Sequence, residues 1–176
     1  MTHLDRADFQ TLFDQFRHSA WRLEIQGSYD EPDEGPLLAQ WLSDGDEAAT
    51  LAWFADWPER IAVQAKQGKQ YSRVRVLTDP PTDYLRWQLG VITPPAISAG
   101  EDIRVLPAAV AATLPLGTAD FWMFDDGRVA VLEFAHGAVT GAQLLDDPRV
   151  VEPFRAIRAT AWDHAVRFEE YRQTRP

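Results

Sequence analysis

The sequence predicts a single α+β domain, with an antiparallel or mixed sheet of about six strands flanked by helices. Three observations predict this class. Strand-like segments are interleaved with segments whose apolar residues repeat at helical spacing. Three of the strand-like segments follow one another closely in the C-terminal third, as in a meander. A length of 176 residues, without an internal repeat or a low-complexity linker, favours one domain over residues 1–176.

The first elements are expected within the first 35 residues. A helix is expected over residues 9–16, in which apolar residues share one face, and Asp5 or Asp8 is placed to cap it. Strict alternation predicts a half-buried strand over residues 21–26. The acidic stretch 28–35, which contains a proline, predicts a loop.

Two helices and a second strand are expected next. Pro36 stands at the first position of a helix, where proline is well tolerated. A further helix is expected from Glu47, with a break or kink at Trp57-Pro58 because proline cannot donate a backbone hydrogen bond. Residues 71–77 alternate again and predict a strand.

Prolines divide the middle of the chain. A helix is expected to begin at Thr82 or Asp83 and to end at Pro94-Pro95, followed by a loop up to Gly100. A short strand is expected over residues 101–106, and a short Ala-rich helix follows it.

The clearest strand signals form the meander. Strands are expected over residues 121–124, 129–134 and 139–145, joined by tight turns at 125–128 and 135–137. Asp and Gly suit these turns because they tolerate positive backbone φ angles. The first strand is apolar throughout, which is typical of a strand covered on both faces.

Trp122 and Phe124 belong to that first strand, so we expect them in the core of a central strand. After the meander, a final helix is expected from Asp147-Pro148 nearly to the end of the chain. Apolar residues hold a helical period over this whole segment.

Composition limits the classes of function. The 45% apolar fraction is ample for a folded core, and the absence of cysteine excludes disulfides and thiolate metal sites. A net charge of −10 is unfavourable for direct binding of nucleic acid. The sequence contains no signal peptide and no apolar run long enough for a membrane, so a cytoplasmic protein without a membrane partner is expected.

Charge is distributed unevenly along the chain. No Lys or Arg occurs between Arg22 and Arg60, and the sign reverses from Arg60 to Arg75. One interpretation is an ordinary solvated surface. The other is an acidic face that attracts a basic protein partner, such as a DNA-binding regulator. The acidic residues of this stretch are Glu24, Asp30, Glu31, Asp33, Glu34, Asp44, Asp46, Glu47, Asp56 and Glu59.

Known catalytic motifs do not occur in the sequence. Phosphate-binding glycine motifs, a G-x-S-x-G elbow and an H-E-x-x-H helix are all missing. The pairs Asp125-Asp126 and Asp146-Asp147 offer oxygen ligands for a hard cation. Turns and helix caps favour Asp for backbone reasons as well. We therefore assign no catalytic residue, no metal and no cofactor.

Arginine and aromatic side chains form the most suggestive group. Arg73 and Arg75 share one face of a predicted strand, and Arg104 is expected on the same surface if its strand is a neighbour. Such a group is suited to an anionic or planar ligand. The candidate binding residues are Arg73, Arg75, Tyr84, Arg86, Trp87, Arg104 and Trp122. The alternative is a structural network in which the arginines pair with Glu24, Glu101, Asp102 and Asp120.

Four blocks occur in order along the chain. They are FRHSAWRLE at 16–24, RVRV at 73–76 followed by Pro80 and DYLRW at 83–87, GEDIR at 100–104, and DFWMFDD at 120–126. Together they resemble an uncharacterised actinobacterial family, a domain of unknown function. Members of that family are commonly encoded near helix-turn-helix regulators. The resemblance therefore implies a regulatory setting and brings no catalytic residues.

At the level of fold alone, the chain also resembles one half of the phospholipase D-like fold, in which a late strand pair precedes a C-terminal helix. The His-x-Lys signature of that fold is missing, because neither Lys66 nor Lys69 lies two residues after a histidine. A shared fold would not by itself imply the activity.

Three functions follow from these observations. We first expect a non-catalytic regulatory or protein-interaction domain that acts with a transcriptional regulator through its acidic face. The alternative is a sensor that binds a small anionic or planar ligand through the arginine and aromatic side chains. A phosphoester hydrolase is the least favoured. An acidic patch without an enclosed pocket favours the first function, a cleft lined by the arginines favours the second, and carboxylates converging on a cation favour the third.

Overall fold

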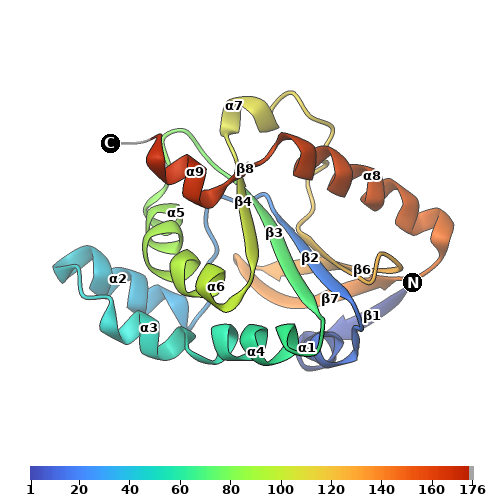
Figure 1. The fold of residues 1–176 in the computed structure, drawn as a ribbon, viewed down its shortest axis with the longest axis horizontal. Helices are drawn as coiled ribbons and strands as arrows, with labels where there is room; N and C mark the ends of the chain where they lie inside the picture. Colours follow the sequence, from blue (N-terminus) through green and yellow to red (C-terminus); the bar gives the residue numbers. More distant parts are fainter. Residues whose placement is uncertain (175–176) are drawn as a thin grey trace.

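The computed structural model describes residues 1–174, and its eight strands form one sheet in the order β1-β7-β6-β5-β2-β3-β4-β8 (Figure 1). Strands β2, β3 and β4 are parallel, and the other neighbouring strands are antiparallel. The predicted α+β class with a mixed sheet is confirmed, although the sheet has more strands than expected. The strands are β1 (Thr2–Asp5), β2 (Ser19–Glu24), β3 (Gln70–Val76), β4 (Asp102–Leu106), β5 (Phe121–Phe124), β6 (Arg128–Ala135), β7 (Ala138–Leu145) and β8 (Val166–Arg167).

Helices flank the sheet, and α2, α3 and α4 follow one another along the side of the molecule away from α8 (Figure 1). Every helix within residues 1–174 is too short or too polar to cross a membrane. The helices are α1 (Arg6–Gln15), α2 (Glu34–Asp44), α3 (Ala48–Phe54), α4 (Asp56–Ala65), α5 (Asp83–Trp87), the π-helix η1 (Gln88–Ile92), α6 (Thr93–Ala99), α7 (Ala108–Ala111), α8 (Pro148–His164) and α9 (Phe168–Gln173).

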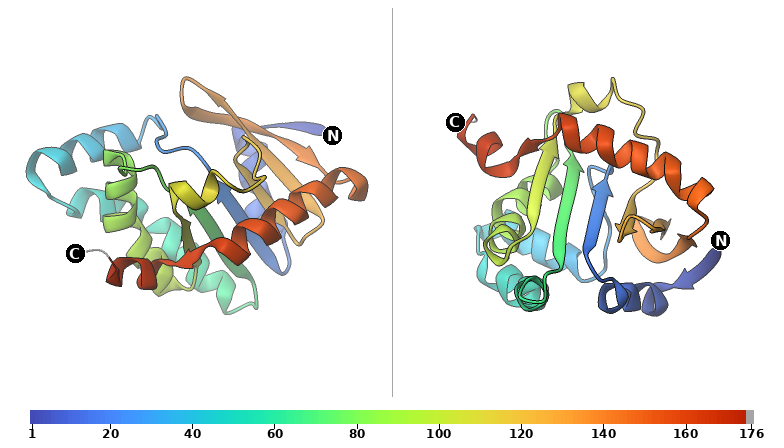
Figure 2. Two further views of the ribbon diagram at one scale, coloured as in Figure 1. Left: turned by 90° about the horizontal axis from the view of Figure 1, so that it is seen from above. Right: turned by 45° about the vertical axis from the view of Figure 1, so that its right-hand side comes forward.

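Each face of the sheet has its own apolar core. On one face, Phe13 of α1 and Ile61 of α4 pack with Trp122 and Phe124 of β5. On the other face, α7 and α8 pack against the alternate residues of the same strands (Figure 2). Trp122 and Phe124 are buried in a strand near the middle of the sheet, so their predicted core position is confirmed.

The edge strands β1 and β8 are missing from the sequence prediction. Both are short and polar, so they show no alternation of apolar and polar residues. β1 pairs with β7 and approaches it closely at Gly141, where a Cβ atom would lie 2.3 Å from the carbonyl oxygen of Leu4. The final helix ends at His164, rather than continuing as expected, and β8 separates it from α9.

The prediction for Pro94-Pro95 is wrong. Instead of ending a helix, the two prolines lie in the first turn of α6, where their missing N–H groups cost no intrahelical hydrogen bond. The π-helix η1 joins α5 to α6, and the expected loop up to Gly100 is therefore helical. The break expected at Trp57-Pro58 occurs earlier, at Ala55, because α3 ends at Phe54 and α4 begins at Asp56, and Pro58 lies in the first turn of α4.

Candidate functional site

The site is built on the sheet face that α1 and α4 cover. In the parallel pair β2–β3, Arg22 lies opposite Arg73 and Glu24 lies opposite Arg75. Trp122 of β5 lies beside Arg22 on the antiparallel side. Because side chains alternate along a strand, all five point to the same face. We call Arg22, Arg73 and Arg75 the arginine floor.

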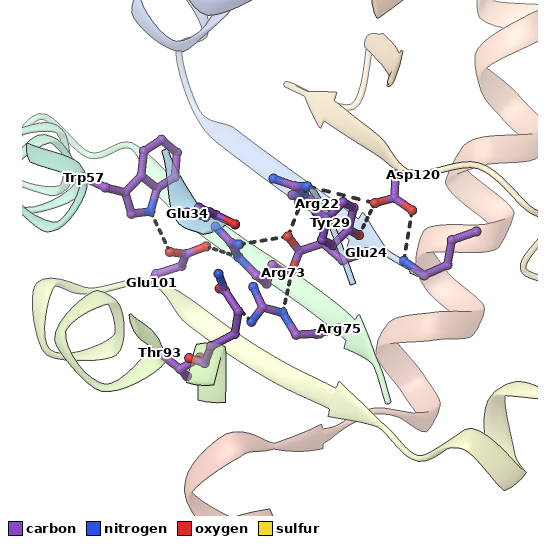
Figure 3. Close-up of polar contacts among 12 residues, drawn as sticks. Arg22, Glu24, Tyr29, Glu34, Trp57, Arg73, Arg75, Thr93, Glu101 and Asp120 are labelled. Carbon is purple, nitrogen blue, oxygen red and sulfur yellow. Dashed lines mark hydrogen bonds and ion pairs between the residues drawn. The ribbon is translucent and has the colours of Figure 1, made fainter. Parts of the chain in front are cut away.

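Glu24 holds the arginine floor together (Figure 3). Its carboxylate accepts hydrogen bonds from Nε of Arg75 at 2.6 Å and Nη1 of Arg73 at 3.3 Å. Nη2 of Arg22 lies 3.1 Å from the same carboxylate. Burial alone would raise the pKa of Glu24, but the three positive charges outweigh burial and hold this pKa well below its usual range. Glu24 therefore remains ionised and fixes the three guanidinium groups.

Each guanidinium group keeps an edge without a partner. Arg73 uses Nε to bind Glu101 at 2.7 Å, and Arg75 uses Nη1 to bind Gln88 at 3.0 Å. Within the described part of the chain, no acceptor lies within hydrogen-bond distance of Nη2 of Arg73 or Arg75. Nε of Arg22 is buried and also lacks a partner in residues 1–174. A buried unpaired donor such as Nε of Arg22 is costly unless an acceptor reaches it.

Two further carboxyl groups flank the floor. Asp120 accepts a hydrogen bond from the backbone N–H of Ile25 at 3.0 Å and another from the hydroxyl of Tyr29. Glu34 accepts a hydrogen bond from the hydroxyl of Tyr84 at 2.7 Å. Burial raises the pKa of both carboxyl groups above their ordinary values. Burial therefore makes the ionised form of these two groups less favourable than it is in water, in contrast to Glu24.

A cleft of about 440 Å³ opens over the arginine floor. Trp122 forms part of its base, with the guanidinium carbons of Arg22 and Arg73 at 5.5 and 5.8 Å from the ring centre. Trp53 and Trp57, four residues apart at the junction of α3 and α4, also line the cleft. The cleft therefore combines strong N–H donors with aromatic surface, the combination that suits a planar ligand with acceptor atoms.

Four of the seven candidate residues line this cleft, namely Arg73, Arg75, Tyr84 and Trp122. Arg86 does not, because its side chain is 57% exposed and pairs with Asp83 one turn earlier on the helix. Trp87 is fully buried, and its Nε1 donates to the Thr50 hydroxyl at 3.2 Å.

The expectation that Arg104 shares a surface with Arg73 and Arg75 is wrong. In the register of β3 and β4, Arg104 lies opposite Val74, so it points to the other face of the sheet. Its guanidinium carbon lies 3.7 Å from the ring centre of Trp162 in α8. Arg104 therefore belongs to the packing under α8.

The site residues that the sequence prediction missed include Arg22, Tyr29 and Trp57. The alternation of Arg22 with Glu24 in a strand was a usable signal for the first of them. Tyr29 lies in the loop predicted over 28–35, which carries no periodic pattern. In the sequence, Trp57 indicates only a helix break. In the structure, its Nε1 donates a hydrogen bond to Glu101 at 3.1 Å.

The expected carboxylate partners are also present. Glu24 and Glu101 bind the arginine floor, and Asp120 lies 4.0 Å from Arg22, while Asp102 pairs with Arg104. The guanidinium groups of the arginine floor therefore bind carboxylates along one edge and remain open to the cleft along the other.

One aspartate of each acidic pair has a backbone role. Asp125 accepts hydrogen bonds from three backbone N–H groups at residues 17–19, and Asp126 pairs with Arg158. Asp147 caps α8. Across residues 1–174, no three His, Asp or Glu side chains gather in a way that would hold a metal ion.

Fold and site together define an α+β domain with an arginine-floored cleft above the parallel strands of its sheet. The family model "Domain of unknown function (DUF6879)" matches residues 7–173, and the chain belongs to this family. No curated protein matches the chain.

Among solved structures, the chain is similar to Nuc from Salmonella typhimurium, described as a phospholipase D family member. The TM-score is 0.56 and the sequence identity is 12%, over 92% of this chain and 89% of that chain. At this identity the likeness shows the fold alone, in line with the resemblance expected from the sequence.

Proposed function

We propose that this protein is a sensor domain that binds a small planar molecule carrying an anionic group, such as a carboxylate, in the cleft above the arginine floor. One observation carries the proposal. The side chain of Arg75 is only 4% exposed and lines the cleft, yet its Nη2 has no acceptor among residues 1–174. A guanidinium edge in this position is best satisfied by ligand oxygen atoms.

The aromatic residues explain why the ligand should be planar. Trp53 is partly exposed where it lines the cleft, and Trp57 lies one helical turn further on. A ring against these indoles would remove apolar surface from water, while its carboxylate would reach the arginine floor. The volume of about 440 Å³ lies within the usual range of small-molecule sites.

Calorimetric titration with para-toluate and naphthoate tests this proposal. Arg75→Lys keeps a positive charge beside Glu24 but removes the free Nη2, so affinity is expected to fall by about ten-fold or more. Arg86→Lys is the matched control, because Arg86 lies outside the cleft. Melting temperatures of both variants establish that they fold. Equal affinity of the wild type and a folded Arg75→Lys variant, or no binding of either probe at millimolar concentration, would refute the proposal.

The surface of α2, α3 and α4 favours a second candidate function, interaction with a basic protein partner such as a transcriptional regulator. Leu42, Leu51, Trp53 and Val63 are between 41% and 49% exposed on these helices. The same segment is rich in acidic residues and has no Lys or Arg before Arg60. Exposed apolar side chains among acids suit a basic amphipathic helix.

A labelled basic amphipathic peptide tests the second candidate by fluorescence anisotropy. Leu42→Ser with Leu51→Ser should weaken binding by removing apolar contact, and added salt should weaken it by screening. The matched control is Val150→Ser, since Val150 is similarly exposed but lies on α8. Binding that ignores both salt and the double substitution would contradict this function. We do not propose hydrolysis, because only the fold links this chain to the phospholipase D family member.

A further inference from the structure

We infer, building on the proposed function, that the ligand of the cleft is a planar ω-amino acid, with a carboxylate at one end for the arginine floor and a cationic amine at the other for Asp33 and Asp56. Both aspartates line the cleft. The amine extends the proposed ligand class, and it makes the bound molecule a zwitterion.

The charge of the cleft supports a ligand without net charge. Its lining contains five arginines and five acidic residues. Two of the arginines are already paired outside the floor, since Arg6 binds Glu31 at 2.9 Å and Arg60 binds Asp14 at 2.9 Å. A dianionic ligand such as a phosphate monoester would add two charges to a floor that Glu24 and Glu101 already neutralise in large part.

The unpaired N–H donors and the unpaired carboxylates lie at different depths in the cleft. The side chains of Arg73 and Arg75 are 11% and 4% exposed and line the cleft, so their free Nη2 groups lie at its base. Asp33 and Asp56 are exposed, and neither side-chain carboxylate has a hydrogen bond or ion pair in the described part of the chain. The cleft therefore offers unpaired donors at its base and unpaired carboxylates at its mouth.

Neither aspartate is held in place by a capping hydrogen bond. Asp33 stands at the N-cap of α2 but makes no capping hydrogen bond. Asp56 begins α4, and the N-terminus of that helix also lacks a side-chain cap. Trp57 follows Asp56 directly and lines the same cleft, so a ring against Trp57 would bring a terminal amine towards the mouth.

Three probes that share one ring separate the contributions of the two charges. They are para-(aminomethyl)benzoate with both charges, para-toluate with the carboxylate alone, and para-methylbenzylamine with the amine alone. We expect para-(aminomethyl)benzoate to bind about three- to ten-fold more tightly than para-toluate, the gain that two exposed charge pairs provide. The amine alone should bind weakest, because it cannot use the arginine floor.

Substitution of the two aspartates provides the decisive comparison. Asp33→Asn with Asp56→Asn should reduce the affinity for para-(aminomethyl)benzoate to that for para-toluate, and leave para-toluate affinity unchanged. Asp163→Asn is the matched control, because Asp163 is exposed on α8, away from the cleft. In the wild type, high salt should remove the gain in affinity of para-(aminomethyl)benzoate over para-toluate.

The outcomes separate this inference from the proposed function. Equal binding of para-(aminomethyl)benzoate and para-toluate, with Arg75→Lys weakening both, overturns the zwitterion and leaves the anion-binding cleft standing. Binding of the amine as tightly as the zwitterion overturns both proposals, because the floor then contributes nothing. A gain for the zwitterion that survives the double Asn substitution overturns the role of Asp33 and Asp56.

Discussion

Replacing Glu24 by Gln removes the negative charge that the three floor arginines share. The amide keeps nearly the same shape, so the change tests charge rather than packing. Three guanidinium groups lie within 3.3 Å of this carboxylate, and its side chain is almost fully buried. Breaking a buried ion network by removing one partner costs about 3–5 kcal/mol of unfolding free energy. For a chain of this length, that corresponds to a fall in Tm of about 6–20 °C.

Urea unfolding followed by circular dichroism measures this loss. Glu152→Gln is the matched control, because Glu152 forms an exposed pair with Arg155 on α8 and should change stability by less than about 0.5 kcal/mol. If Glu24→Gln costs no more than the control, the floor arginines do not depend on Glu24. The assignment of a fixed, charged floor would then be refuted.

Lowering the pH should reduce the difference in unfolding free energy between the wild type and Glu24→Gln. The folded pKa of Glu24 lies below its ordinary value of 4.5, so its stabilisation is complete above pH 4.5 and is lost as pH falls towards the folded pKa. The stability difference should therefore be largest near neutral pH and shrink below about pH 4.5. A difference that grows on acidification would contradict the direction of this shift.

The remaining predictions concern other parts of the fold. Trp122→Ala should cost about 3–5 kcal/mol in urea unfolding, and a nearly unchanged midpoint would show that β5 is not central. Glu34→Gln should gain stability relative to the wild type as pH rises from 4.5 to 8, because the raised pKa of Glu34 makes its ionised form unfavourable, and a flat difference would contradict this. Gly141→Ala should lower Tm clearly more than Gly35→Ala, whose Cβ would meet nothing within 4 Å, and equal Tm values would contradict the close approach of β1. Duplex DNA should show no salt-sensitive binding at near-physiological salt, given a net charge of −10, and a shift in anisotropy would overturn that expectation.

Local sequence patterns are sufficient to predict most of the helices and strands. The apolar run at residues 121–124 and the turns after it predict β5, β6 and β7 closely, because each signal lies within a few residues. Pro94-Pro95 gives an ambiguous signal, because a proline pair fits the first turn of a helix as well as its end. β1 and β8 form only because long-range partners, β7 and β4, accept them.

The site required information that no single strand carries. Alternation correctly placed Arg73 and Arg75 on one face. It left the relative register of β3 and β4 undetermined, and that register puts Arg104 opposite Val74. A shift of one residue in register moves a side chain to the other face of the sheet. Knowing which segments are strands is therefore insufficient to place Arg104. Trp53 and Trp57 reach the cleft from α3 and α4, and no periodicity in the sequence indicates that these helices lie over the arginine floor.

The pairing of β1 with β7 constrains the order in which the chain can assemble during translation. Residues 2–5 leave the ribosome long before residues 141–144, which are their hydrogen-bonding partners. For most of synthesis this short segment has no strand to join, and contacts of such sequence separation form slowly. β7, which is eight residues long, would meanwhile present an open edge as soon as it is made. A delay in the return of β1 would therefore favour pairing of β7 with another nascent chain, so yield and solubility should be sensitive to changes in the first five residues.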